Sequence, residues 1–251
     1  MYRSNSGWAS RRWRRGALGL LLAGAMVVGA LFAAEPVDAS ASAQPSFFNS
    51  TEVRSDNLKP FKKWLSAIDK FNKETAEAKT SKCTAKEMNA CHYEAWTKFL
   101  LGIVKKPPLE QVKDVNDFMN RAKYITDPVN WGEKDYWESP GEFMAKFGDC
   151  EDYAIAKYMS LKRLGFKDDQ LRVVAVQDLN LKVGHAILLV FLDGKTWLLD
   201  NQIKQLVEAK TVHHYQPVFS INEHFWLVSI TRGSMPNGVS NVMRYCGFNE
   251  A

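Results

Sequence analysis

The sequence predicts an α+β domain, because helical patterns occupy the first part of the chain and strand patterns follow. Residues 59–80 carry apolar side chains at helical spacing, with lysines on the opposite face: Phe61, Trp64, Leu65, Ile68 and Phe71. After Gly165 the apolar residues form short runs separated by turn residues, which is typical of strands. We therefore expect helices first, then an antiparallel sheet, and no internal repeat.

Each expected helix ends at a recognisable stop signal. Proline stops a helix because it lacks an N–H and its ring clashes with the preceding turn, and glycine is favoured just beyond a helix end. The expected helices are 59–80, 94–104, a third from Leu109 or Asp114 to Asp127-Pro128, and a fourth from Cys150 to Gly165.

The remaining segments are expected to be strands and loops. The strands are 171–176, 185–192, 196–200 and 225–230. Residues 44–57 are expected to be a polar lead-in without periodicity, and 131–137 an aromatic loop closed by Ser139-Pro140. That loop could line a substrate cleft or belong to the core.

The N-terminus predicts export. Residues 11–15 are basic, residues 16–34 are uncharged and apolar, and Ala41-Ser42-Ala43 fits a signal-peptidase site. We expect a signal peptide at 1–43 and one domain at 44–251, located in a bacterial periplasm. The apolar run is also long enough to remain as an uncleaved membrane anchor.

The basic charge of the chain belongs to this leader. Residues 1–43 hold five arginines and two acidic residues, so their removal lowers the net charge from +5 to +2. A nearly neutral domain gives no compositional support for nucleic-acid binding.

The four cysteines are Cys83, Cys91, Cys150 and Cys246. An oxidising compartment favours disulfides, but Cys83 and Cys91 would lie roughly 12 Å apart on a straight helix. They can pair only if the chain turns between them. Cys150 must stay reduced if it is a nucleophile.

Cys150 is the candidate nucleophile, because it opens an amphipathic helix after a Gly-Asp turn. A helix N-terminus stabilises a thiolate through its partial positive charge and its free N–H groups. The competing interpretation is a buried structural cysteine, which is the commoner fate of the residue.

His185 and Asp200 are the candidate partners of this thiol. Asp193-Gly194 predicts a two-residue hairpin, so that the numbers of paired residues sum to 387. Ile187 then lies opposite Asp200, and His185 lies diagonally from it on the same face, within reach of a hydrogen bond. In such a triad Cys150 and His185 form a thiolate–imidazolium pair and Asp200 orients the imidazole. Asn201 is a further orienting residue or a turn former.

The acids around Cys150 oppose a thiolate. One like charge at ~5 Å, with an effective dielectric constant of ~20, costs about 3 kcal/mol. A divalent cation held by Asp149, Glu151 and Asp152 would reverse this effect, and hard carboxylate ligands favour Ca²⁺. Carbonyl ligands are expected from the loop at Asp135-Tyr136-Trp137. The alternative is an ordinary acidic first turn, with Asp149 as the N-cap.

At these residues the sequence resembles the bacterial transglutaminase-like cysteine proteinase family, and within it the LapG-type proteases. The resemblance runs from 115 to 201. Its motifs are Asp127, Trp131-Gly132, Asp135-Tyr136-Trp137, Gly148-Asp149-Cys150-Glu151-Asp152-Tyr153-Ala154, Gly184-His185-Ala186 and Leu199-Asp200-Asn201.

The resemblance implies a papain-like fold, a Cys150–His185–Asp200 triad and calcium-dependent endoproteolysis. It also implies two partners, a large surface adhesin cut in its N-terminal region and an inner-membrane cyclic-di-GMP receptor that sequesters the protease. Cleavage of the adhesin would release biofilm cells. Two other classes remain open, a protein-crosslinking transglutaminase and a non-catalytic calcium-dependent binding module.

Overall fold

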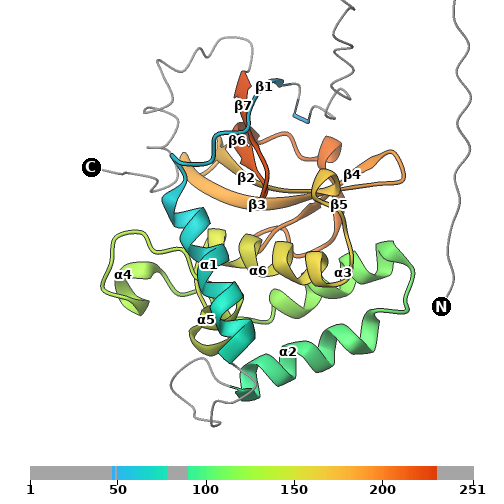
Figure 1. The fold of residues 1–251 in the computed structure, drawn as a ribbon. Coiled ribbons are helices and arrows are strands. Elements are labelled where there is room, and N and C mark those ends of the chain that lie inside the picture. The colour runs from blue at the N-terminus through green and yellow to red at the C-terminus, as the bar shows by residue number, and fades with distance from the viewer. Residues whose placement is uncertain (1–46, 49, 78–89, 231–251) are drawn as a thin grey trace, which may run out of the picture. The chain divides into compact units, whose positions relative to one another are not determined.

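The computed structural model describes residues 47–48, 50–77 and 90–230, apart from the side chains of 77 and 90–93, and consists of a sheet covered by helices (Figure 1). Seven antiparallel strands follow the order β1-β7-β6-β2-β3-β4-β5. They are β1 (Thr51–Ser55), β2 (Leu171–Asp178), β3 (Val183–Leu192), β4 (Lys195–Leu199), β5 (Val207–Glu208), β6 (Tyr215–Ile221) and β7 (Trp226–Ile230). The predicted α+β class is confirmed.

Among the described residues, six α-helices precede β2, and Figure 1 shows them on one face of the sheet. They are α1 (Lys62–Glu77), α2 (Ala90–Ile103), α3 (Pro108–Met119), α4 (Asp127–Asn130), α5 (Pro140–Lys146) and α6 (Cys150–Arg163). All of them except the short α4 contribute buried side chains to the main core. Two 3₁₀-helices, η1 (Asp168–Gln170) and η2 (Ala209–Thr211), lie among the strands.

The core lies mainly between these helices and the sheet. Buried side chains of α1, such as Trp64, and of α6, such as Ile155, pack with Leu188 and Val190 of β3. The alternate residues of β3, Ile187 and Leu189, belong to a smaller cluster on the other face. β3 is therefore buried on both faces, which explains why its sequence is a continuous apolar run rather than an alternating one.

The hairpin of β3 and β4 has the register that its turn residues predict. Leu192 pairs with Lys195 and Leu188 with Leu199, so the paired numbers sum to 387. Asp193 and Gly194 both have positive φ, 52° and 71°, as a type I′ turn requires.

Three strands, β1, β5 and β6, and two α-helices, α4 and α5, were not expected from the sequence pattern. β1 lies in the segment expected to be a polar lead-in without periodicity. Its side chains are mostly exposed, so its sequence shows no alternation, and the strand is held by pairing with β7. β6 contains Pro217, which sits beside a register shift against β2, where a missing N–H is tolerated. The third helix ends at Met119, earlier than expected, and Asp127-Pro128 instead begins the short α4, because proline is well suited to a first helical turn.

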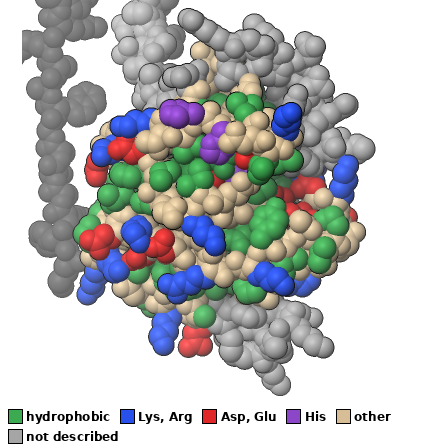
Figure 2. Space-filling view, turned by 180° about the vertical axis from the view of Figure 1, so that it is seen from behind, with side chains coloured by type: hydrophobic (Ala, Val, Ile, Leu, Met, Phe, Trp, Pro, Cys, Tyr) green, Lys and Arg blue, Asp and Glu red, His purple; other side chains and the backbone are tan. Residues whose placement is uncertain are grey.

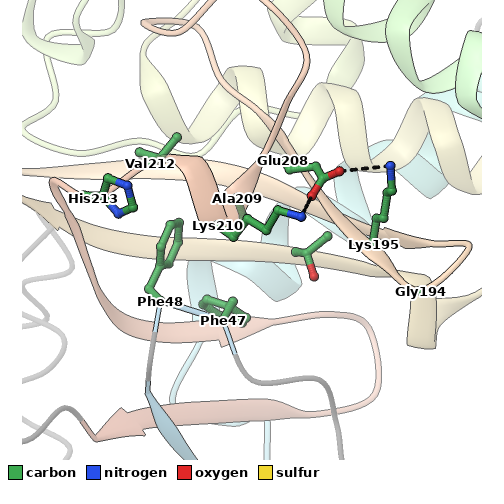
Figure 3. A pocket seen from close by; sticks show the side chains of 10 residues that line it. Phe47, Phe48, Gly194, Lys195, Glu208, Ala209, Lys210, Val212 and His213 are labelled. Atoms are coloured by element: carbon green, nitrogen blue, oxygen red, sulfur yellow. Dashed lines mark ion pairs between the residues drawn. The ribbon is translucent and has the colours of Figure 1, made fainter.

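The second face of the sheet carries a cavity of about 350 Å³ (Figure 3). Phe47 and Phe48 line it, and ion pairs from Lys195 and Lys210 to Glu208 cross its rim. None of its lining residues is a predicted site residue.

Basic side chains are spread over the face seen in Figure 2, among acidic and apolar ones, rather than gathered in one patch. None of the helices within the described ranges has the length and apolar character needed to cross a bilayer. The expected leader at 1–43 lies outside the described residues, and so do Cys83 and the side chain of Cys91, whose pairing the sequence left open.

Candidate active site and cation site

Cys150 is the first residue of α6, and the turn before it is built around Asp152. The N–H of Asp149, the N-cap, donates to Asp152 Oδ2 at 3.0 Å. A Cβ on Gly148 would collide with the Asp152 carboxylate and lie 2.7 Å from its Cβ. Only glycine allows this close approach, so Gly148 is needed for the geometry of the helix start.

The Cys150 thiol is partly exposed and lies beside a carboxyl group. Its Sγ donates to Glu151 Oε2 at 3.2 Å. The side chain of Glu151 is buried, and burial together with the charges of Asp149 and Asp152 raises its pKa well above the ordinary value. Without a cation, therefore, this environment favours a neutral thiol.

His185 and Asp200 lie in contact, as the hairpin register predicts. His185 Nε2 is 2.8 Å from Asp200 Oδ1, and both residues are only 1% exposed. If Nε2 carries the proton donated to Asp200, Nδ1 is the acceptor nitrogen, and the side-chain Nε2 of Gln202 lies 3.3 Å from it.

Tyr215 and Gln202 complete the surroundings of this pair, and neither was identified from the sequence. The Tyr215 hydroxyl donates to Asp200 Oδ2 at 2.7 Å, and the Gln202 N–H donates to Oδ1 at 3.0 Å. Burial raises the pKa of Asp200, but hydrogen bonds from His185, Tyr215 and Gln202 outweigh it and hold that pKa below the ordinary value. Asp200 is therefore a stable anion that can orient an imidazolium.

The nucleophile helix is adjacent to this pair. α6 packs against β3, the strand that carries His185. Burial raises the pKa of Tyr215, and the charges of Asp200 and Cys150 are among the further causes.

The acids predicted to bind a cation form part of a larger cluster, here called the acidic cluster: Asp127, Asp135, Asp149, Glu151 and Asp152. Carboxylate oxygens of Asp127, Asp135 and Glu151 all lie within 4.8 Å of one another, as do those of Asp127, Asp149 and Asp152. Asp127 and Asp135 were not proposed as ligands from the sequence, although Asp135 belongs to the loop expected to supply carbonyls.

Burial makes these carboxylates costly to ionise together. Burial first, and then the charges of Asp149 and Asp135, raise the pKa of Asp127 to about 7. The pKa values of Asp149 and Asp152 are raised as well, chiefly by burial. The neighbouring Glu138 is fully buried and has a pKa of about 8. A divalent cation bound among these buried acids would be the largest local charge, and it would stabilise their ionised forms.

The acidic cluster fits a calcium ion. Asp127 Oδ1 and Asp149 Oδ1 are buried and accept no hydrogen bond from any residue that the structure describes. All the candidate donors are oxygens, which Ca²⁺ prefers. Each oxygen of Asp152 already accepts an N–H, from Glu138 or Asp149, and retains a second lone pair.

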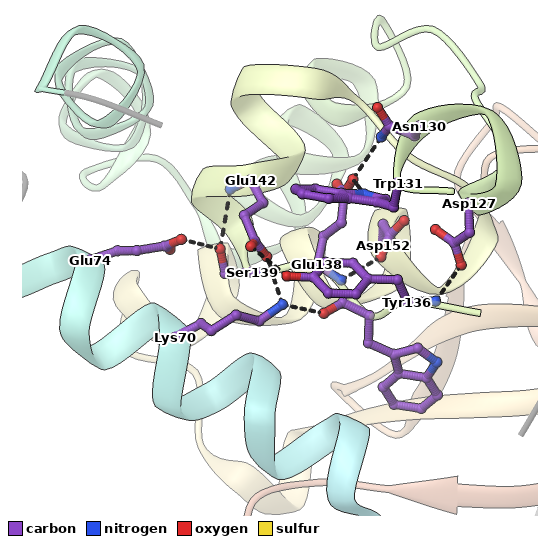
Figure 4. A network of polar contacts seen from close by, with 11 residues as sticks. Lys70, Glu74, Asp127, Asn130, Trp131, Tyr136, Glu138, Ser139, Glu142 and Asp152 are labelled. Atoms are coloured by element: carbon purple, nitrogen blue, oxygen red, sulfur yellow. Dashed lines mark hydrogen bonds and ion pairs between the residues drawn. The ribbon is translucent and has the colours of Figure 1, made fainter. Parts of the chain in front are cut away.

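Polar contacts hold the cluster in shape (Figure 4). The N–H of Tyr136 donates to Asp127 Oδ2 at 2.5 Å, and Glu138 Oε1 accepts from Trp131 Nε1 at 2.6 Å. Lys70 of α1 bonds Trp137 O and Glu142 Oε2. The N–H of Glu138 donates to Asp152 Oδ1 at 2.8 Å, so the loop from α4 to α5 is tied both to α6 and to α1.

A thiol at a helix start beside a buried His–Asp pair defines a candidate thiol hydrolase, and the comparison with known families agrees. The family of bacterial transglutaminase-like cysteine proteinases (BTLCP) matches residues 74–232. This match spans more than half of the chain, and the chain therefore belongs to that family.

Within the family, the chain is similar to LapG of Legionella pneumophila. One LapG structure is 32% identical to this chain and has a TM-score of 0.53. The match covers 62% of this chain and 87% of the LapG chain. An EGTA-treated form is 31% identical (66% and 88% covered, TM-score 0.55), and a calcium-bound form is 30% identical (69% and 97% covered, TM-score 0.54). No curated protein matches the chain. The protein is a LapG-like cysteine proteinase.

Proposed function

We propose that this protein is a calcium-dependent cysteine endopeptidase that cuts the N-terminal region of a large surface adhesin. The observation that carries the catalytic part is the buried His185–Asp200 contact of 2.8 Å, next to a helix that begins at Cys150. The similarity to calcium-bound LapG and the fit of the acidic cluster support the calcium requirement.

The reaction uses the three groups in sequence. His185 Nδ1 takes the proton from Cys150 Sγ, and the thiolate attacks the scissile carbonyl carbon while Asp200 stabilises the imidazolium. The imidazolium then gives its proton to the leaving amine as the C–N bond breaks, which leaves a thioester. Water, deprotonated by His185, hydrolyses the thioester and restores the thiol. The Cys150 N–H at the helix start is the candidate donor to the oxyanion.

Calcium, when bound, supplies positive charge that allows the acidic cluster and the thiolate to be ionised together. Asp127, Asp135, Asp149, Glu151 and Asp152 are the residues that would hold it. Glu151 is central to this dependence, because its carboxyl group accepts the thiol hydrogen bond at 3.2 Å. When Glu151 is engaged with a cation, its carboxyl oxygen no longer accepts the thiol hydrogen bond, and the thiol can donate its proton to His185 instead.

The adhesin substrate, the cyclic-di-GMP receptor that sequesters the protease, and the periplasmic location are proposals supported by family membership. Export by residues 1–43 agrees with all three, because an adhesin and the outer domain of a membrane receptor would both be reached from the periplasm.

The decisive experiment is cleavage of a purified adhesin N-terminal fragment, with Ca²⁺ or excess EGTA, by wild type and Cys150→Ala. We expect calcium-dependent cutting that the substitution abolishes. Cutting that persists in EGTA would remove the calcium requirement. Ammonia release with amine incorporation would identify a crosslinking transglutaminase instead, and no reaction with a cognate substrate would favour a binding module.

A further inference from the structure

Helix α1 contributes a cation to the acidic cluster. The Nζ of Lys63 forms an ion pair and hydrogen bond with Asp135 Oδ2. The Asp135 side chain is only 6% exposed, whereas that of Lys63 is 29% exposed. The ammonium therefore approaches the cluster from its solvent side and reaches an otherwise buried carboxylate.

Lys63 acts on the cluster as a whole and not only on Asp135. Oxygens of Asp135, Asp127 and Glu151 lie within 4.8 Å of one another, so a charge on Asp135 is close to the other two. The charge of Lys63 is among the effects that lower the pKa of Asp127, against the larger effect of burial. Lys63 thus already supplies part of the positive charge that the cluster lacks.

We propose that Lys63 is a built-in competitor of calcium, which must leave Asp135 when the ion binds. This inference rests on the proposed calcium site and concerns how tightly that site holds its ion. An ammonium hydrogen and a calcium ion cannot share one carboxylate lone pair. The two positive charges would also repel each other if both contacted the Asp135 carboxylate. Calcium binding is then an exchange of one cation for another, so the site holds calcium more weakly than its carboxylates alone would allow.

The rest of α1 does not need to move for this exchange. Lys70 lies two turns further along the same face and binds Trp137 O at 2.6 Å and Glu142 Oε2 at 2.7 Å. Its Nζ also lies 4.0 Å from the centre of the Tyr136 ring. Because Lys70 keeps the helix docked, the partly exposed Lys63 side chain can turn to solvent by rotamer changes alone.

Calcium titration by calorimetry at pH 7.5 tests the exchange, with Lys73→Met as the matched control. Lys73 is exposed on the same helix and loses the same charge when substituted. We expect Lys63→Met to bind calcium on the order of tenfold more tightly than wild type, and Lys73→Met to bind as wild type does. Thermal unfolding adds a second readout: Lys63→Met should melt lower than wild type in EDTA, and calcium should raise its melting temperature by more.

A measurement on the unsubstituted protein covers the case in which Lys63→Met folds poorly. Acetylation of lysines, followed by mass spectrometry, should show Lys63 modified several-fold faster with calcium than with EDTA. Lys70 should stay slow, and Lys73 fast, in both conditions.

The possible failures are distinct. Wild type that binds no calcium would overturn the calcium site and this inference together. Wild type that binds calcium, with unchanged or weaker affinity in Lys63→Met or unchanged acetylation of Lys63, would overturn the competition alone.

Discussion

Raising the pH of the calcium-free protein from 6 to 8 removes protons from buried carboxyl groups, and we expect its free energy of unfolding to fall. The pKa of Asp127 is raised from 3.8 to about 7, and that of Glu138 from 4.5 to about 8, chiefly by burial. Between pH 6 and 8 the folded state therefore binds more protons than the unfolded state. Stability must then decrease as the pH rises through the folded-state pKa values.

The size of the effect follows from these two pKa values. Treated as isolated groups, Asp127 contributes a loss of about 1.4 kcal/mol and Glu138 a loss of about 2.3 kcal/mol over this interval. The two carboxyl groups interact, so we expect a combined loss of about 2–4 kcal/mol.

Lys157 opposes this trend. Its side chain is fully buried, and burial lowers its pKa from 10.5 to about 7. The folded state then binds fewer protons than the unfolded state, which adds about 1.4 kcal/mol of stability between pH 6 and 8. Because Lys157 lies outside the acidic cluster, its contribution is the same with and without calcium, and a difference measurement cancels it.

Urea unfolding at pH 6, 7 and 8, in excess EDTA and in saturating calcium, gives that difference. Calcium should stabilise the protein by about 2–4 kcal/mol more at pH 8 than at pH 6, because protons compete for the carboxylates that calcium would use. Asp127→Asn should reduce the pH dependence in EDTA by about 1.4 kcal/mol. Equal stabilisation by calcium at both pH values would refute this account of the cluster.

Three further substitutions test the surroundings of the site. Tyr215→Phe removes the hydroxyl that binds Asp200 at 2.7 Å; we expect kcat for a peptide substrate to fall by about tenfold, as the loss of one hydrogen bond to a charged group predicts. Gly148→Ala should lower the free energy of unfolding by more than about 2 kcal/mol and weaken calcium binding, because the added methyl collides with Asp152; a normal denaturation midpoint would contradict this. Lys157→Met should raise the melting temperature at pH 6, because Nζ of Lys157 is buried without a hydrogen-bond partner among the described residues.

The His–Asp contact could be predicted from sequence because it depends on local rules. A two-residue turn at Asp193-Gly194 sets the register of one hairpin, and both side chains lie on that hairpin or directly after it. Tyr215 could not be found in this way. It lies on β6, which pairs with β2, and Pro217 obscures the strand pattern.

The cation site was only partly predictable for a related reason. Asp149, Glu151 and Asp152 are neighbours in sequence, so their clustering is evident from the motif. Asp127 and Asp135 join them only through the path of the chain between α4 and α5, which is fixed by contacts such as Tyr136 N–H to Asp127. Sequence spacing carries no information on such contacts.

The same turn of chain positions the Cys150 thiol and part of the acidic cluster. We therefore expect the reactivity of the thiol and cation binding to depend on each other. Cys150 lies between Asp149 and Glu151, so any change that moves the thiol also moves candidate ligands. Glu151 has a pKa well above its ordinary value and accepts the hydrogen bond of the thiol. Without a cation, burial and the neighbouring charges favour the neutral form of Glu151, and the thiol faces that carboxyl group. Chelation should then remove activity through this local charge balance, with the His185–Asp200 contact and the core around α6 left intact.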